Sequence, residues 1–255
     1  MHAHNLSNPG ALAVVAALVA AAPTAAAAAD TSPTGVRGLS AAWWQWALSI
    51  PAAANPLTVP ETKDSALCGI GQHGDAWFLG GTINTQAKVV RSCRVPSGTR
   101  ILLAVINGEC SVVEDPGLGS RKALRACAKD QMDLVTEATA TLDGRNARVI
   151  RTQSPLFSVT LPPGNVLSIT SPTPNPSPAV ADGFWVLIGP LAPGHHNMTA
   201  HGTLVVPGPG GFTFVQDVTY AIEVVSPQFG TSAAIPQALV PSGAIMPAVA
   251  PSPVN

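Results

Sequence analysis

Charged residues are scarce in this sequence. Lys, Arg, Asp and Glu together make up 11% of the 255 residues, and the formal net charge is −1. A chain with so little charge has no strong field with which to attract nucleic acid or an anionic membrane surface. We therefore expect no nucleic-acid partner.

Aromatic residues are also few. Phe, Trp and Tyr account for 5% of the chain, which has a single tyrosine. A sugar-binding sheet face needs exposed rings, but only Trp77 and Trp185 fall on predicted strands. This pattern gives little support to a glycan-binding sheet, although contact with a glycan or with the cell envelope stays open.

Familiar catalytic and metal-binding motifs are missing. There is no C-x-x-C pair and no G-x-S-x-G motif, and the stretches GIGQHG and GPGG lack the strand-turn-helix context of a phosphate loop. We therefore expect a non-catalytic protein, structural or binding in role, with no cofactor and no metal. The alternative is a secreted hydrolase whose site is assembled from residues distant in sequence, which a fold class alone does not exclude.

The N-terminal 29 residues predict a signal peptide, even though they contain no Lys or Arg. They continue as ALAVVAALVAAAPTAAAAA and reach Asp30 through small residues that suit Ala-x-Ala cleavage. The apolar run before Pro23 is about a dozen residues, short of the roughly 20 that cross a bilayer. We expect a secreted or otherwise extracytoplasmic protein, in the periplasm or at the cell surface, without a transmembrane span in the mature chain.

Export affects how the cysteines are interpreted. The chain has four, which are Cys68, Cys93, Cys110 and Cys127. An even number of cysteines in an oxidising compartment predicts two disulfides, for which three connectivities exist. We favour the sequential pairing, Cys68 with Cys93 and Cys110 with Cys127, because each pair brackets one local unit. Loops of about 25 and 17 residues would each contribute on the order of 3 kcal/mol.

The chain between residues 30 and 225 reads mainly as strands. The run TRILLAVIN is apolar at both parities, as expected of a strand covered on both faces. Asp-Gly inside ATATLDGRNARVIR predicts a tight hairpin. Further strands are predicted at DAWFLGGT, AKVVRSCRV, PLFSVTLP, NVLSIT, GFWVLIGP, NMTAHGTLVV and FTFVQDVTYAIEVV. We expect a single antiparallel β-sandwich domain, Ig-like or jelly-roll-like, with two helical segments.

The first predicted helix is SAAWWQWALSIP, residues 40–51, which holds three of the five tryptophans. Ser40 suits the N-cap, and Leu39 and Trp44 are spaced for a hydrophobic staple. The other large residues form one apolar stripe, namely Trp43, Trp46, Ala47 and Ile50. We expect a helix that docks on the β core rather than an exposed platform for a sugar.

The second predicted helix runs from about Ser120 to Ala138. Leu124, Cys127, Met132 and Val135 share one face at helical spacing. Cys127 on this face would tie the helix to the preceding strand through Cys110.

His73, His195, His196 and His201 are candidate site residues. In HHNMTAHGTLVV the odd positions are polar, and His195 and His201 would lie about 20 Å apart, too far for one metal ion. His196 shares parity with the apolar face, so we expect a half-buried histidine that donates to a backbone carbonyl. The alternatives are a site that joins His196 to His73 or Asp217, and a carboxylate site with Asp217 and Glu223.

The last 30 residues, 226–255, contain six prolines and no charge. They predict a disordered tail without a sorting motif.

Taken in order, several motifs resemble a family of exported bacterial proteins of unknown function. They are WWQWALSIP, CGIGQHGDAWFLGGT, RSCRVPSGTRILLAVINGEC, ATLDG, SPLFSVTLPPGN, ADGFWVLIGPLAPGHHNMTAHG and FVQDVTYAIEV. The resemblance covers residues 40–224. His196 keeps the histidine of the family pattern, whereas Ala200 stands where an aromatic residue is typical. The resemblance implies no catalytic residues.

Overall fold

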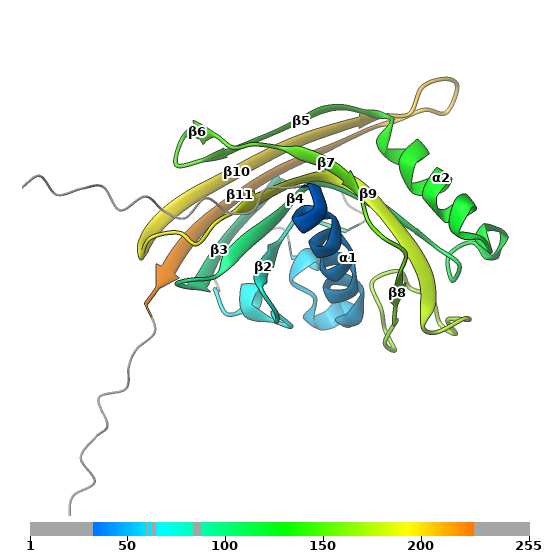
Figure 1. The fold of residues 1–255 in the computed structure, drawn as a ribbon, viewed down its shortest axis with the longest axis horizontal. Helices are drawn as coiled ribbons and strands as arrows, with labels where there is room; N and C mark the ends of the chain where they lie inside the picture. The colour runs from blue at the N-terminus through cyan, green and yellow to red at the C-terminus, as the bar shows by residue number, and fades with distance from the viewer. Residues whose placement is uncertain (1–32, 60, 63–64, 84–87, 227–255) are drawn as a thin grey trace, which may run out of the picture.

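The structure is a computed structural model that describes residues 33–59, 61–62, 65–83 and 88–226. Over these residues the chain forms two β-sheets and two α-helices (Figure 1). The predicted signal peptide lies outside the described residues, and so does the predicted tail apart from Ser226. No helix in the described part of the chain is long and apolar enough to cross a membrane.

The two sheets pack face to face, which confirms the predicted β-sandwich. The larger sheet has the order β1-β3-β11-β10-β5-β6, with β1 at Glu61–Thr62, β3 at Lys88–Pro96, β11 at Thr213–Val225, β10 at Gly194–Val205, β5 at Val135–Leu142 and β6 at Arg145–Asn146. The smaller sheet has the order β2-β4-β9-β7, with β2 at Ala76–Leu79, β4 at Arg100–Ser111, β9 at Ser177–Ile188 and β7 at Ile150–Gln153, while β8 at Phe157–Val159 pairs with β9. Short 3₁₀ turns are η1 (Ala52–Ala54), η2 (Pro56–Thr58), η3 (Leu67–Gly69) and η4 (Pro116–Leu118).

Most strand pairs are antiparallel, as predicted, but both sheets also contain parallel pairs, which the sequence does not predict. β2 pairs with β4 in parallel, and β3 pairs in parallel with both β1 and β11. The cause is the path of the chain, because β3 crosses to the larger sheet before β4 returns to lie beside β2. Sequence patterns identify strands but not the sheet that each strand joins.

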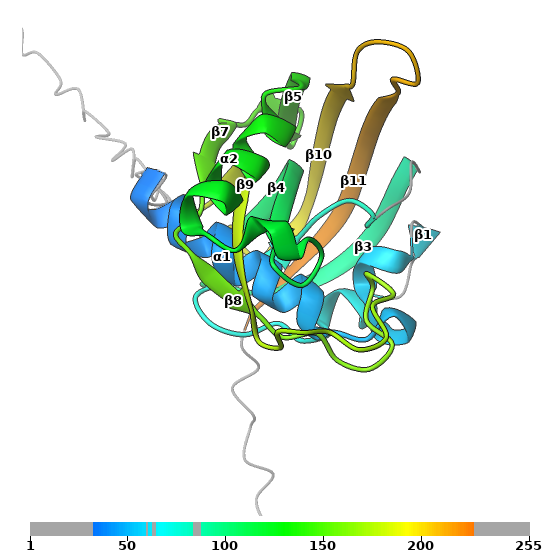
Figure 2. The same cartoon turned by 90° about the vertical axis from the view of Figure 1, so that its right-hand side faces the viewer.

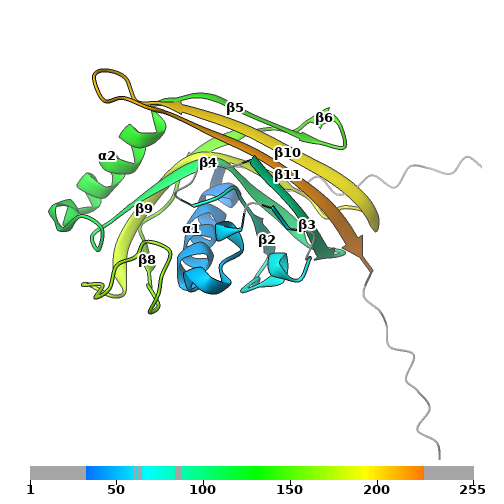
Figure 3. The same ribbon diagram turned by 180° about the vertical axis from the view of Figure 1, so that it is seen from behind.

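β4 is the strand covered on both faces, as predicted from its double apolar parity. Residues 101–106 are all buried. Ile101 and Leu103 face the larger sheet, whereas Leu102 and Ala104 belong to the cluster formed with helix α1 (Pro33–Ser49). The molecule therefore has three layers, and α1 covers the side of the smaller sheet that faces away from the larger sheet (Figures 1 and 3).

Helix α1 begins at Pro33, so the prediction of an N-cap at Ser40 is wrong. The Ser40 hydroxyl donates to the Arg37 carbonyl at 2.9 Å inside the helix. Because a hydrophobic staple is defined relative to the N-cap, the predicted staple of Leu39 with Trp44 is wrong as well. Pro suits the first turn of a helix, and Val36 is fully buried against the sheet. Packing of this turn overrides the weak helix propensity of its glycines.

The three neighbouring tryptophans are buried, which confirms the docking helix and excludes an exposed platform. Trp43, Trp44 and Trp46 are 3%, 8% and 1% exposed. Trp43 meets Trp185 of β9 edge to face, with ring centroids 5.7 Å apart. The ring N-H of Trp43 donates to the Leu79 carbonyl at 2.8 Å and that of Trp46 to the Ile70 carbonyl at 3.0 Å.

Helix α2 occupies Arg121–Met132 and ends earlier than predicted. Ser120 is its N-cap and accepts from the Ala123 N-H at 3.1 Å. Val135 is not on the helix, because residues 135–142 pair with β10 as strand β5. The alternating threonines of this segment suit a strand, and the available partner decides its structure.

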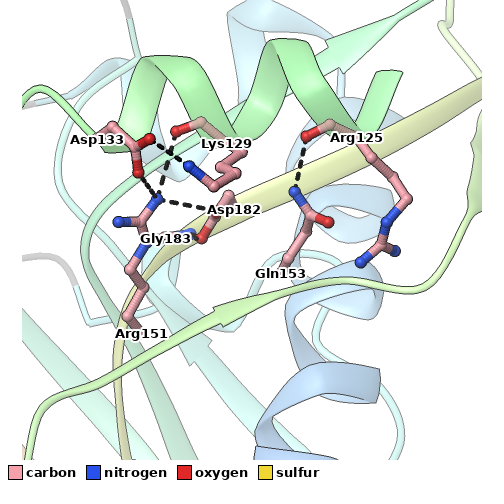
Figure 4. Close-up of polar contacts among 7 residues, drawn as sticks. All are labelled: Arg125, Lys129, Asp133, Arg151, Gln153, Asp182 and Gly183. Carbon is pink, nitrogen blue, oxygen red and sulfur yellow. Dashed lines mark hydrogen bonds and ion pairs between the residues drawn. The ribbon is translucent and has the colours of Figure 1, made fainter. Parts of the chain in front are cut away.

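Polar side chains dock α2 on the smaller sheet at one end of the molecule (Figures 2 and 4). Arg151 of β7 reaches the carboxylates of Asp133, at 2.8 Å, and of the buried Asp182, at 3.2 Å. Gln153 donates to the Arg125 carbonyl at 2.8 Å. This network satisfies the buried carboxylate of Asp182, so we read it as a structural feature rather than a site.

Both predicted disulfides are present, which confirms the sequential pairing. Cys68–Cys93 joins η3 to β3 across 25 residues, and Cys110–Cys127 joins β4 to α2 across 17 residues. The predicted hairpin also forms, because Asp143 and Gly144 between β5 and β6 have φ angles of 50° and 74°. These features are local in sequence, which is why the sequence predicts them.

The predicted strand NVLSIT, residues 165–170, does not form. Asn165 closes this segment as a loop, because its side-chain amide donates to the Ile169 carbonyl at 2.8 Å and accepts from the Ile169 N-H at 3.2 Å. An asparagine that bonds nearby backbone in this way competes with strand pairing.

Trp46 and Trp44 differ in their ring N-H hydrogen bonds, so replacing each by phenylalanine should change the free energy of unfolding by different amounts. Trp46→Phe deletes the N-H that serves the Ile70 carbonyl, so we expect the free energy of unfolding to fall by about 1–3 kcal/mol. Trp44→Phe is the matched control, because the Trp44 N-H has no partner. Denaturant unfolding measures both variants, and equal losses would contradict the assigned hydrogen bonds.

Candidate functional site

A cavity of about 360 Å³ lies where α1, the end of β4 and the beginning of β11 meet. Trp43 and Trp44 contribute aromatic walls from α1, and Phe214 and Gln216 come from β11. The segment Ile106–Glu109 supplies the wall from β4. A volume of this size lies in the usual range for small-molecule sites, about 300–1,000 Å³.

A β-bulge at Val105 sets the direction of the polar residues that follow on β4. Ala104 pairs with Trp185 and Ile106 with Phe184, so Val105 is the extra residue and the side-chain alternation is reset. Asn107 then pairs with Gly183, and Glu109 pairs with Ala181, which lies in the core cluster of α1. Asn107 and Glu109 therefore point to the helix side of the smaller sheet.

Gly183 is required for this arrangement. A Cβ atom at position 183 would lie 2.5 Å from the Cβ of Asn107 and 3.1 Å from the ring nitrogen of Trp185. No side chain fits in that space without moving the backbone of β4. The glycine thus makes room for Asn107 in the wall of the cavity.

Several polar groups in this wall have no hydrogen-bond partner. Glu109 is 9% exposed, and neither of its carboxyl oxygens has a hydrogen bond of normal length, although the Ser111 and Glu114 side chains lie close to it. The Asn107 side-chain nitrogen and the Trp44 ring nitrogen are also buried and unbonded. Because buried polar groups in folded proteins are normally paired, this concentration in one place marks the cavity as a candidate site.

The environment of Glu109 favours its uncharged form. Burial is the main cause that raises the pKa of Glu109 well above its ordinary value, and the neighbouring Glu114 carboxylate raises it further. Glu114 is exposed and accepts a 2.6 Å hydrogen bond from Ser111. Among the described residues that line the cavity, none is Lys, Arg or His.

This arrangement provides a defined set of bonds. A protonated carboxyl at Glu109 donates once and accepts once, while Asn107 and Trp44 offer N-H donors. The two neighbouring carboxyls are also suited to proton transfer, since burial raises the pKa of Glu109 whereas Glu114 is exposed. The site can therefore bind a polar molecule or take part in acid-base chemistry.

His196, a candidate from the sequence, lies outside this cavity. It is half-buried, and its Nε2 donates to the Ala192 carbonyl at 2.9 Å, as expected from the strand pattern. Its Nδ1 meets Asp143 of the hairpin turn at 2.8 Å. Burial lowers the pKa of His196, but its bonds to Asp143 and Ala192 outweigh burial and raise it.

Asp217 likewise lies outside the cavity and contacts a neighbouring histidine on the exposed face of the larger sheet. Its carboxylate meets His201 Nδ1 at 2.7 Å, and Glu137 lies 3.4 Å from His201 Nε2. Within the described residues no group of three or more His, Cys, Asp or Glu side chains is placed to hold a metal ion.

The remaining candidates are separate from the cavity as well. His73 is exposed and bonds through Nδ1 to the Gly71 carbonyl at 2.7 Å. Glu223 forms an ion pair with Arg94 at 3.0 Å, and Glu223 and His196 line one shallow surface pocket of about 260 Å³. The structure does not bring the four sequence candidates together.

Glu109, Asn107 and Glu114 were missed by the sequence analysis. The available signal is the segment INGEC, where an amide and an acid continue a strand that is apolar on both parities. The sequence does not show that this continuation is still covered by α1.

Comparison of the chain with models of known protein families, with curated proteins and with solved structures finds no match. The candidate site therefore rests on the geometry of this chain.

The raised pKa of Glu109 predicts a pH-dependent effect of Glu109→Gln. A carboxyl whose pKa is higher in the folded state contributes stability below its unfolded pKa and loses that contribution as the pH rises through the folded pKa. We expect Glu109→Gln to become increasingly more stable than the wild type as the pH rises from about 4 through the raised folded-state pKa of Glu109. Denaturant unfolding across this range measures the difference.

Asp130→Asn is the control, because Asp130 is exposed on α2 and does not line the cavity. It should not gain stability as the pH rises. A constant difference between Glu109→Gln and the wild type over the whole range would contradict the assignment of a shifted Glu109.

Proposed function

We propose that this chain is an exported, disulfide-stabilised β-sandwich protein that binds a small molecule in the cavity around Glu109. The observation that carries the proposal is the unbonded, buried carboxyl of Glu109 beside the unbonded nitrogens of Asn107 and Trp44. Leaving such groups unpaired costs about 1–3 kcal/mol each. A ligand that pairs them recovers part of this cost.

Export is supported by two independent features. The N-terminal 29 residues have the composition of a signal peptide, and the mature body carries two disulfides. We place the protein in an extracytoplasmic compartment, in the periplasm, at the cell surface or outside the cell. This agrees with the proposed relation to a family of exported bacterial proteins.

The lining of the cavity favours binding over nucleophilic catalysis. Of the described lining residues, none is Ser, Cys, Lys or His, and Thr82 offers the one hydroxyl group. A covalent mechanism lacks its usual parts here.

A second candidate function is hydrolysis by general acid-base catalysis. The observation in its favour is that the neighbouring Glu114 raises the pKa of Glu109 further, as happens between two carboxyls that lie close together. Glu109 would protonate a leaving group and Glu114 would activate a water molecule.

A small-molecule screen of the purified protein tests the proposed function. We expect specific compounds to raise the melting temperature, because a ligand that binds only the folded state stabilises it. Calorimetric titration should then show at least about tenfold weaker binding to Asn107→Leu, which keeps the size of the side chain but removes its hydrogen-bonding groups.

His73→Ala is the matched control for this screen, since His73 lies on an exposed loop outside the cavity. This variant should bind the compound with the same affinity as the wild type. Binding that is unaffected by Asn107→Leu would contradict the assigned site. Turnover of a bound compound that is lost in both Glu109→Gln and Glu114→Gln would favour the hydrolase instead.

A further inference from the structure

The lining of the cavity restricts the charge of its ligand. Glu109 and Glu114 are its ionisable side chains among the described residues, and no basic side chain is present to neutralise an anion. A carboxylate or phosphate would lie next to the Glu114 carboxylate without compensation. Burying an unpaired charge costs several kcal/mol, so an anionic ligand is disfavoured.

A cationic ligand is a poor match for a different reason. Asn107 and Trp44 present N-H donors, and each of these needs an acceptor. An ammonium group has donors only, so it would leave both nitrogens unpaired. The Glu114 carboxylate could balance the charge of such a ligand, but the ligand would still offer no acceptor to these nitrogens.

A hydroxyl group suits both the N-H donors and the carboxyl groups of this cavity, because it donates and accepts at the same time. Hydroxyls can accept from Asn107 and Trp44, and can both donate to and accept from the protonated carboxyl of Glu109. Two or more neighbouring hydroxyls on one molecule are needed to reach these separate groups.

The aromatic side chains provide the complementary apolar surface. Trp43 already uses its N-H on the Leu79 carbonyl, so its contribution to the cavity is the ring surface. Phe214 lines the same cavity from β11. The C-H face of a small ring can pack on such surfaces, and 360 Å³ suits one ring rather than a chain of rings.

From these observations we infer that the cavity takes an uncharged, polyhydroxylated molecule of the size of a monosaccharide. The inference rests on the proposed function of the same cavity. The unbonded atoms are covered from solvent as the side chains stand, so binding includes a side-chain adjustment in the wall. Adjustments of this kind are common when a ligand binds.

A matched ligand series tests the inference on the full-length protein. The series contains glucose and galactose, their amino and uronate counterparts, and the polyols myo-inositol and mannitol. Benzamide, indole and cadaverine are added as compounds without hydroxyl groups. We expect saturation-transfer NMR and calorimetry to show binding of at least one neutral hydroxylated member, with its charged counterpart at least about tenfold weaker.

Two variants locate the contact. Trp44→Phe should weaken binding of the neutral member by about two- to tenfold, because it removes one N-H donor and keeps most of the ring. Trp46→Phe is the control, because Trp46 does not line this cavity and its N-H serves the Ile70 carbonyl. It should bind as the wild type does, even though it is less stable.

Different results would overturn the proposed small-molecule binding and the inferred ligand class. If the charged counterparts or the compounds without hydroxyl groups bind best, and Asn107→Leu weakens them, the inference is overturned while the proposed function stands. If nothing in the series binds, the inference is overturned, and the proposed function is overturned as well only if the wider small-molecule screen also finds no ligand. Equal effects of Trp44→Phe and Trp46→Phe on affinity would also overturn the inference.

Discussion

Burial of β4 on both faces is the constraint on which the rest of the structure depends. The larger sheet covers Ile101 and Leu103, and the helix layer covers Leu102 and Ala104. A strand without a solvent face requires a second covering layer, which α1 provides with its tryptophans.

The candidate site is a consequence of the same constraint. β4 continues beyond its apolar part, and after the bulge at Val105 it carries Asn107 and Glu109 into a region that α1 still covers. Polar groups placed there lose water and find no partner in the fold. The cavity beside them, with its aromatic walls, is where we propose that a ligand pairs these groups.

The sequence predicts those features that depend on neighbours along the chain. The Asp143–Gly144 turn, both disulfides, the capped start of α2 and the double burial of β4 are of this kind. Features decided by tertiary partners were missed or wrong. The end of α2 depends on pairing of β5 with β10, and the parallel pairing of β2 depends on the crossing of β3. The site belongs to this second group, because its walls come from α1, β4 and β11, which are far apart in sequence.

The most direct test of this account is the titration of the Glu109 side-chain carboxyl, followed by carbon NMR on protein with labelled glutamate and assigned with Glu109→Gln. The account predicts a midpoint well above the ordinary value of a glutamic acid, because burial and the neighbouring Glu114 both disfavour its charge. An ordinary midpoint for Glu109 would show that its carboxyl is solvated, and would contradict the buried, unpaired acid on which the site rests.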